Sequence, residues 1–269
     1  MDIGVSTACL YPNITENSFQ KLINIGFKTF EIFLNSPSEL ENDFIIKLKN
    51  MADNNNCKIK SIHPFSSGME PLLLFSNYYR RFKDGLKFYE KYFYCAEKLG
   101  AKILVLHGGK NNRKDGISSD EYFERFLKLA DLGEKYGIIL AHENVNQYIC
   151  QHIDFILKMN AALDNKVKYV FDIKQSIRAG HDPIEMCKAM GKNIVHVHIN
   201  DNSNLHDCLL PGAGTMDYNK IKNLLDSFNY NGDIIIEVYR NNFKNLNEIK
   251  KSEKFLNTIF NCNFVKNLL

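Results

Sequence analysis

One pattern constrains the fold of this chain more than any other: short apolar runs alternate with longer stretches of helical spacing, and they do so eight times. The predicted strands cover residues 3–6, 29–33, 58–63, 103–107, 138–143, 168–172, 194–198 and 234–238. No low-complexity linker separates these units. We therefore predict an α/β fold, a single parallel (β/α)8 TIM barrel that forms one domain over residues 1–269, with a doubly wound open sheet as the alternative.

Signals for helix ends support this alternation. The stretch 121–136 has an apolar side, and Ser118 with Glu121 three residues later forms a predicted capping box in front of it. Gly100 lies between a helical stretch and the next strand, where a helix C-cap in the left-handed region favours glycine.

Bulk properties narrow the classes of partner. A net charge of +3 is too small to indicate a polyanionic partner, so nucleic acid is not expected. The chain opens without a signal-peptide pattern, and no apolar run approaches the roughly 20 residues that cross a bilayer, so we expect no membrane association and a cytoplasmic location. The cysteines are odd in number and form no C-x-x-C pair, which argues against a disulfide framework and favours buried thiols. They are Cys9, Cys57, Cys95, Cys150, Cys187, Cys208 and Cys262.

The seventh predicted strand, I-V-H-V-H-I-N-D at 194–201, carries two histidines that share one face. A buried strand normally fills such inward positions with aliphatic residues. His196 and His198 therefore need hydrogen-bond partners or a metal ion.

Polar residues stand at the ends of the last six predicted strands, where a barrel gathers its reactive groups. They are His63, His107, Glu143, Asp172, His198 and Glu237. Three carboxylates crowded together raise one another's pKa unless a cation lies among them, so we predict a divalent metal ion. The predicted ligands are Glu143, Asp172, His198 and Glu237, a mixed oxygen and nitrogen set that suits Mn²⁺, Co²⁺ or Zn²⁺ better than Mg²⁺.

Other candidate roles stay open at this point. His63 and His107 either hold a second metal ion with Glu143 or donate hydrogen bonds to substrate. Lys174 shares strand parity with Asp172, and Arg178 and Arg240 lie in neighbouring loops, so each either receives a substrate phosphate or carboxylate or lies on the surface. Glu31 is a further candidate for substrate contact. Gly212 and Gly214 are expected to shape the loop after strand seven, with phosphate binding as the alternative.

Six short motifs, in order and in the matching strand context, resemble the xylose isomerase-like TIM-barrel superfamily. They are L-H-G-G at 106–109, H-E-N at 142–144, F-D-I at 171–173, H-V-H-I-N-D at 196–201, L-P-G-A-G at 210–214 and I-I-E at 235–237. The superfamily includes sugar-phosphate isomerases and epimerases, inosose dehydratases, tagatose-type ketose 3-epimerases and endonuclease IV.

The resemblance implies roles for individual residues. Glu143, Asp172, His198 and Glu237 match the metal ligands of the sugar epimerases, and His63 and His107 match additional ligands of endonuclease IV. By this match His198 is the ligand, and His196 lies one layer deeper.

The chain also departs from these relatives. Gln175, His206 and Cys208 stand where endonuclease IV completes its third zinc site, which disfavours a three-zinc phosphodiesterase. Gln175 and Asn204 replace the histidine and arginine of the ketose 3-epimerases, which puts ketohexose specificity in doubt. The run 172–180 resembles a branch of sugar-phosphate isomerase/epimerase proteins.

We therefore expect a divalent-metal-dependent sugar or sugar-phosphate isomerase/epimerase in which Glu143 and Glu237 transfer protons through an enediolate. The alternatives are an endonuclease IV-like two-metal phosphodiesterase, a keto-inositol dehydratase, and a non-catalytic carbohydrate-binding protein. The expected partner is a small carbohydrate or sugar phosphate, and a homo-oligomer is one open possibility.

Overall fold

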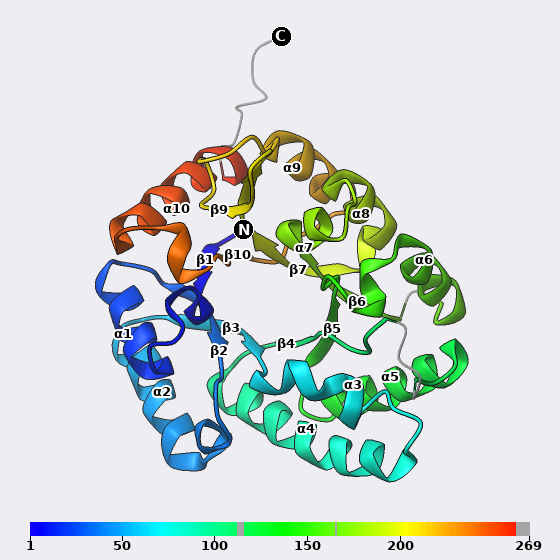
Figure 1. The fold of residues 1–269 in the computed structure, drawn as a ribbon. Coiled ribbons are helices and arrows are strands. Elements are labelled where there is room, and N and C mark those ends of the chain that lie inside the picture. The colour runs from blue at the N-terminus through cyan, green and yellow to red at the C-terminus, as the bar shows by residue number, and fades with distance from the viewer. Residues whose placement is uncertain (112–115, 165, 262–269) are drawn as a thin grey trace.

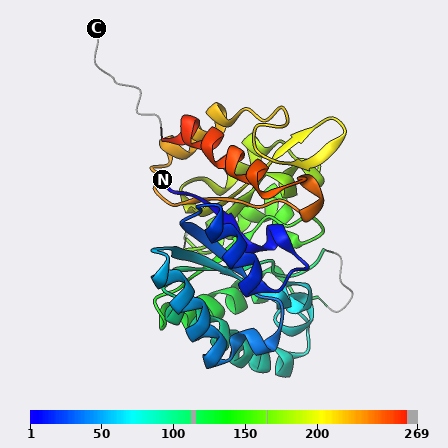
Figure 2. The same ribbon diagram turned by 90° about the vertical axis from the view of Figure 1, so that its left-hand side faces the viewer.

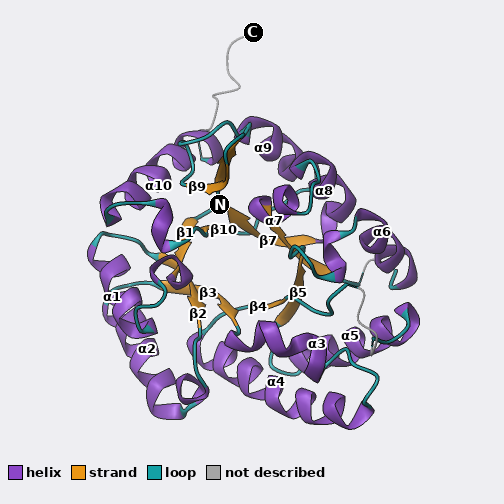
Figure 3. Cartoon of the chain, viewed as in Figure 1, coloured by secondary structure: helices purple, strands orange, loops and turns teal. Residues whose placement is uncertain are grey.

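The computed structural model describes residues 1–111, 116–164 and 166–261 of the chain. Eight parallel strands close into a barrel in the order β1, β2, β3, β4, β5, β6, β7 and β10. Helices form a ring outside the strands (Figure 1), and the colouring by secondary structure separates the two layers (Figure 3). The predicted fold class, a (β/α)8 barrel, is confirmed.

The barrel strands lie within two residues of the predicted boundaries. They are β1 (Ile3–Ser6), β2 (Thr29–Phe33), β3 (Lys58–His63), β4 (Ile103–Leu106), β5 (Ile139–Glu143), β6 (Lys168–Asp172), β7 (Ile194–Ile199) and β10 (Ile234–Ile236). The helices are α1 (Thr15–Asn24), α2 (Asn42–Asn54), α3 (Glu70–Leu73), α4 (Tyr79–Leu99), α5 (Ser119–Glu134), α6 (Ile153–Ala162), α7 (Ile173–Arg178), α8 (Pro183–Met190), α9 (Tyr218–Ser227) and α10 (Leu246–Phe260).

An antiparallel hairpin that the sequence pattern did not predict follows β7. It consists of β8 (Asp201–Ser203) and β9 (His206–Leu209). Viewed from the side, the hairpin projects at the end of the barrel opposite to the N-terminus (Figure 2). This is the end at which the parallel strands finish, so the hairpin stands beside the barrel mouth.

The predicted helix-end signals act as expected. The Ser118 hydroxyl accepts a hydrogen bond from the Glu121 amide at 3.2 Å and caps α5, which begins two residues before the predicted stretch. Gly100 caps the C-terminus of α4 with φ of 78°, in the left-handed region that glycine adopts without strain.

The core has two parts. The larger one lies between the strands and the helices and contains large buried side chains such as Tyr89, Phe93 and Phe126. A small apolar cluster of Val105, Ala141 and Val170 lies inside the barrel itself. Among the six described cysteines, five are buried and none forms a disulfide, whereas Cys262 lies outside the described residues.

The loop after the hairpin is held by an aspartate. Asp201 Oδ2 accepts hydrogen bonds from the amides of Gly212 and Gly214 at 2.9 and 3.0 Å. These two amides are therefore engaged within the loop, in agreement with the predicted structural role. Within the described part of the chain, no helix has the length and apolar character needed to cross a membrane.

Candidate active site

The barrel mouth brings together all six residues predicted from the strand ends. Four of them form one group, here called the main cluster, which consists of Glu143, Asp172, His198 and Glu237. Three form a second group, here called the histidine cluster, which consists of His63, His107 and Glu143. In each group the candidate ligand atoms lie within 4.8 Å of one another, and Glu143 belongs to both.

Three carboxylates of the main cluster converge on one imidazole nitrogen. The distances from His198 Nδ1 are 3.3 Å to Glu143 Oε1, 3.7 Å to Asp172 Oδ2 and 3.4 Å to Glu237 Oε2. Burial alone would lower the pKa of His198, but the carboxylates of Glu31 and Glu237 outweigh it and hold this pKa well above its ordinary value. The carboxylates around His198 therefore stabilise a positively charged group between them.

The other ring nitrogen of His198 contacts the carboxylate of Glu31, which lies deeper inside the barrel. His198 Nε2 lies 3.0 Å from Glu31 Oε2, and the same oxygen lies 3.2 Å from His196 Nε2. His196 Nε2 also lies 3.0 Å from Ser61 Oγ, which gives this buried histidine the hydrogen bond that the sequence required. A carboxylate that orients a ligating histidine is a common arrangement at metal sites.

The expected substrate contact of Glu31 is not supported by its position. Its side chain is fully buried beneath His198 and does not line the pocket at the mouth. Inward-facing residues on β2 are separated by about 6.6 Å for every two residues, so Glu31 lies one layer below the pocket, whereas Phe33 reaches it.

Asparagines and a helix N-terminus hold Asp172, and the sequence reasoning missed their role. Asn144 Oδ1 accepts from the Asp172 amide at 2.8 Å, and Asn200 Nδ2 donates to Asp172 Oδ1 at 3.2 Å. The amide of Gln175, in the first turn of α7, donates to the same Oδ1 at 3.3 Å. Both asparagines belong to motifs that the sequence displays, H-E-N and H-V-H-I-N-D, and this membership was the available signal.

Lys174 lies inside the main cluster. Its ammonium donates to Asp172 Oδ2 and to Glu237 Oε2, and the residue is 2% exposed. Burial would lower its pKa, but Asp172 and Glu237 raise it well above the ordinary value. Strand parity was the wrong reason to place Lys174 at the mouth, because β6 ends at Asp172 and Lys174 belongs to helix α7.

The histidine cluster has the spacing of three ligands around one ion. His63 Nε2 and His107 Nε2 are 3.1 Å apart, and they lie 3.7 and 3.1 Å from Glu143 Oε2. Ligands about 2.0–2.1 Å from a tetrahedral ion stand about 3.3 Å from one another. Burial lowers the pKa of His107, which favours the neutral form that binds metal.

A pocket of about 390 Å³ opens above both clusters. This volume lies within the range of small-molecule sites. Aromatic rings form much of its wall, and polar groups lie at its base. The lining residues are Ala8, Tyr11, Phe33, Asn35, His63, Phe65, His107, Glu143, Lys174, Gln175, Glu237, Val238 and Tyr239.

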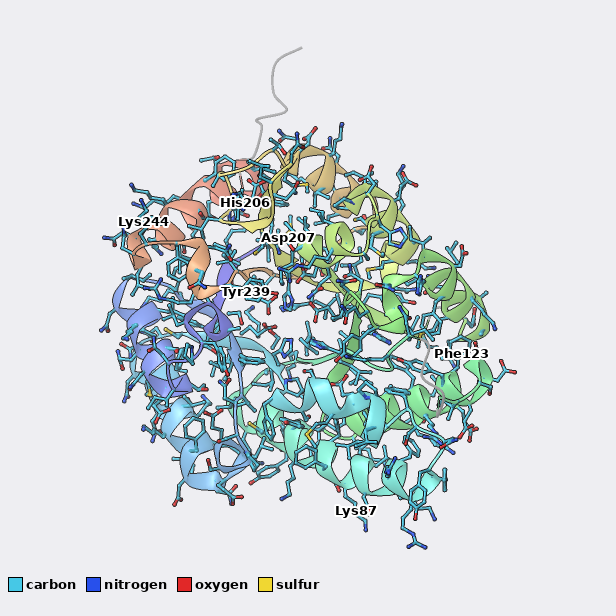
Figure 4. All side chains as sticks on the ribbon, viewed as in Figure 1. Lys87, Phe123, His206, Asp207, Tyr239 and Lys244 are labelled. Atoms are coloured by element: carbon cyan, nitrogen blue, oxygen red, sulfur yellow. The ribbon has the colours of Figure 1, made fainter. Side chains whose placement is uncertain are left out.

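The two candidate arginines differ in position. Arg178 is not one of the residues that line the pocket, but it contacts Tyr239, which is: it donates to the Tyr239 hydroxyl and to Asp207 Oδ2, each at 2.5 Å, and stacks over the Tyr239 ring at the rim. Figure 4 labels Tyr239 and Asp207 at this inner edge of the ring of helices. Arg240 is exposed, bonds the carbonyl of Phe243 and does not line the pocket. Of the two roles left open for Arg240, this position fits the surface role.

The donor set of the main cluster fits a divalent ion. It offers carboxylate oxygens and one imidazole nitrogen at close spacing, and two of these carboxylates form ion pairs with the Lys174 ammonium. Glu143 Oε2 is buried and, among the described residues, finds no donor in hydrogen-bonding geometry. Such a set suits Mn²⁺, Co²⁺ or Zn²⁺.

Comparison with known protein families agrees with this geometry. The family model described as "Xylose isomerase-like TIM barrel" matches residues 19–259. The chain belongs to the xylose isomerase-like TIM-barrel family. This family assignment confirms the resemblance that the six motifs indicated.

Individual known proteins are similar to the chain at low sequence identity. An inosose dehydratase of Clostridium beijerinckii is 24% identical over 260 residues, which is 82% of each chain. A crystal structure of a D-tagatose 3-epimerase-like protein superimposes with a TM-score of 0.78 at 23% identity and covers 97% of each chain. A structure of the IolI protein with a bound zinc atom gives a TM-score of 0.78 at 17% identity, over 98% of this chain and all of that one.

Proposed function

We propose that this protein is a divalent-metal-dependent sugar or sugar-phosphate isomerase or epimerase. The observation that carries the proposal is the pair of carboxylates at the pocket base. Glu143 ends β5 and Glu237 directly follows β10, and these two strands are three places apart around the barrel. Both carboxylates converge on His198. A binding protein needs no such pair of potential bases, whereas a proton-transfer enzyme does.

The side chains of Glu143 and Glu237 are held in the charged form that can accept a proton. Burial would raise the pKa of Glu143, but His107 and His198 outweigh it and hold this pKa well below its ordinary value. Lys174 and His198 likewise lower the pKa of Glu237 against the effect of burial. At neutral pH both side chains are therefore charged and able to accept a proton.

Their placement supports two related reactions on an α-hydroxy carbonyl sugar. For epimerisation, one carboxylate removes the proton from the carbon beside the carbonyl, while the other takes up a proton from solvent and delivers it to the opposite face of that carbon. The first carboxylate then releases its proton to solvent, which restores both bases. For isomerisation, one carboxylate returns the proton to the neighbouring carbon. In both reactions negative charge develops on the substrate oxygens, and positive charge at the pocket base stabilises it.

The main cluster supplies the metal ligands of this proposal. When bound by Glu143, Asp172, His198 and Glu237, a divalent ion supplies positive charge next to the reacting oxygens. Asn144 and Asn200 hold Asp172 in position, and Glu31 orients His198. His63 and His107 either donate hydrogen bonds to substrate or bind a second ion together with Glu143.

The pocket walls suit a carbohydrate. Tyr11, Phe33, Phe65 and Tyr239 present ring surfaces, on which the C–H faces of a sugar can pack. Arg178 at the rim is the proposed receiver of a phosphate, because its side chain is 25% exposed and its guanidinium lies over the ring of Tyr239, which lines the pocket. The similarity to sugar epimerases and to an inosose dehydratase supports this substrate class.

Replacement of each base tests the proposal. Glu143→Gln and Glu237→Gln should each lower kcat by about 10²–10⁴-fold, because the amide cannot accept the proton. The exposed Glu97→Gln variant on α4 is the matched control and should leave kcat unchanged. Metal content and circular dichroism should establish that the variants are folded and loaded. A kcat within threefold of wild type in either site variant would contradict the assignment.

Specific observations favour two other candidates. The similarity to an inosose dehydratase favours dehydration of a keto-inositol, which begins with the same proton removal. The spacing of the histidine cluster favours a two-metal phosphodiesterase. Formation of a product with one water fewer would identify the first, and metal-dependent cleavage of abasic DNA would identify the second.

A further inference from the structure

The main cluster contains a cation that belongs to the protein itself. Helix α7 begins at Ile173, directly after the last residue of β6, so Lys174 lies in its first turn and its side chain extends back over the strand end. The ammonium reaches the two carboxylates that flank the cluster, Asp172 and Glu237. Both contacts lie at the base of the pocket.

The charges around this ammonium explain why it is buried there. Four buried or nearly buried carboxylates surround His198, and they belong to Glu31, Glu143, Asp172 and Glu237. Within residues 1–111, 116–164 and 166–261, Lys174 is the lysine or arginine that forms ion pairs with them. Arg178, the next cationic residue along α7, pairs with Asp207 at the rim instead. Buried carboxylates without a cation would be costly.

The ammonium and a divalent ion need the same oxygen of Asp172. Oδ1 already accepts hydrogen bonds from Asn200 Nδ2 and from the Gln175 amide. Oδ2, which faces His198 Nδ1, is the oxygen left to bind a cation, and it is the one that accepts from Lys174. A metal–carboxylate bond of about 2.0–2.2 Å leaves no room for an ammonium on the same side of that oxygen.

The ammonium and a divalent ion also need the same oxygen of Glu237, the other carboxylate that Lys174 contacts. Its Oε2 lies 3.4 Å from His198 Nδ1 and accepts a hydrogen bond from Lys174. The ammonium therefore bridges two of the four proposed metal ligands. A second positive charge beside it would also repel an incoming ion.

We propose that the Lys174 ammonium and a divalent ion are alternative occupants of the main cluster. Lys174 is the resident cation that keeps Asp172 and Glu237 together when no metal ion is bound, and a metal ion binds only when the ammonium moves away into the pocket. Metal affinity is thus set partly by competition inside the protein. This inference rests on the proposed function in one respect, because it uses the four metal ligands that the proposed function assigns.

Metal titration of Lys174→Met tests the competition without any substrate. Affinity for Mn²⁺ and Co²⁺ would be measured by isothermal titration calorimetry on wild type, on Lys174→Met, and on the control Lys188→Met, which removes an exposed lysine of α8. We expect Lys174→Met to bind each ion at least tenfold more tightly than wild type, and the control to match wild type. Equal or weaker binding by Lys174→Met would overturn the proposal.

Two further measurements keep the test decisive if Lys174→Met does not fold. Lys174→Gln removes the charge and retains a polar side chain, so it should show the same gain in affinity. In wild-type protein, saturating Mn²⁺ should increase acetylation of Lys174, measured by mass spectrometry, because the displaced ammonium reaches the pocket. Acetylation unchanged by metal would overturn the proposal.

Failure of this inference can be told apart from failure of the proposed function. A gain in metal affinity without any proton exchange on sugars would support the competition and contradict the isomerase proposal. Metal-dependent proton exchange on a sugar in wild type, together with equal metal affinities of wild type and Lys174→Met, would support the isomerase proposal and contradict the competition.

Discussion

Two layers of side chains inside the barrel, only two residues apart on the same strands, have opposite character. The lower layer on β4, β5 and β6 consists of Val105, Ala141 and Val170. The upper layer at the ends of these strands consists of His107, Glu143 and Asp172. The lower three side chains are fully buried and pack against each other, whereas the upper three face the pocket or its base.

The difference shows how the barrel separates stability from chemistry. Apolar packing in the lower layer needs no partner beyond close contact, so it can support the strands in any bound state. The buried carboxylates of the upper layer need positive charge beside them, which His198 supplies together with either Lys174 or the proposed metal ion. Substitutions in the two layers should therefore act on different properties, and the following predictions test this separation.

The largest expected effect comes from moving a charge into the lower layer. Ala141→Asp would bury a carboxylate among valines without a partner, so we expect a loss of about 3–5 kcal/mol in the free energy of unfolding. Urea denaturation followed by circular dichroism measures it. The control Ala161→Asp, on an exposed site of α6, should change stability by less than about 0.5 kcal/mol. Equal stability of the two variants would contradict the separation.

Glu70 offers the next largest effect, because it is a buried carboxyl without the cations of the upper layer. It contacts the Tyr89 hydroxyl and the Gly108 amide, each at 2.5 Å, and burial raises its pKa to about 8. The folded state thus retains a proton that the unfolded state loses near pH 4.5. This stabilisation is complete at lower pH and is lost as the pH rises toward 8.

The neutral variant Glu70→Gln should remove this pH dependence. Its free energy of unfolding should change less between pH 5 and 8 than that of wild type, which should lose up to about 1.4 kcal/mol per pH unit through this group. Parallel pH profiles for Glu70→Gln, wild type and the exposed control Glu97→Gln would contradict the assignment.

A smaller effect is expected from a cavity in the lower layer. Val170→Ala removes two buried methyl groups, so we expect a loss of about 2 kcal/mol in the free energy of unfolding. Because the upper layer keeps its own contacts, kcat should stay within about threefold of wild type. A fall in kcat of a hundredfold or more would show that the two layers are not independent.

The smallest effect concerns the rim above both layers. Arg178→Leu removes the proposed phosphate contact, so KM for a phosphorylated sugar should rise about tenfold, which corresponds to about 1.4 kcal/mol, while KM for the free sugar should change much less. Arg240→Leu, at an arginine outside the pocket, is the control. A larger effect in Arg240→Leu would reverse the two roles.

Periodicity was enough to predict the barrel, because short segments that contain apolar residues alternate eight times with amphipathic stretches. The hairpin of β8 and β9 was missed, since its strands are short and lie in a stretch of turn-forming residues. The prediction of one domain over the whole chain stays a prediction, because residues 112–115, 165 and 262–269 lie outside the described part.

The candidate site was predictable to the extent that strand ends determine it. The six predicted residues meet at the mouth because parallel strands finish on one side of the barrel. Glu31 lies one layer below the pocket, and Lys174 reaches the pocket from helix α7 rather than from a strand, because these positions depend on contacts across the barrel and on where α7 begins. No local pattern contains this information.

The central claim is proton transfer at a carbon beside a sugar carbonyl. The most direct test is exchange of substrate protons with D₂O, followed by NMR over ketoses, aldoses, inososes and their phosphates, with Mn²⁺, Co²⁺ or Zn²⁺ added. We predict that wild-type protein exchanges the α-proton of at least one substrate, that chelation of the metal abolishes this exchange, and that Glu143→Gln and Glu237→Gln greatly reduce it. Exchange that persists at the wild-type rate in both variants, or no exchange with any substrate and metal, would contradict the claim.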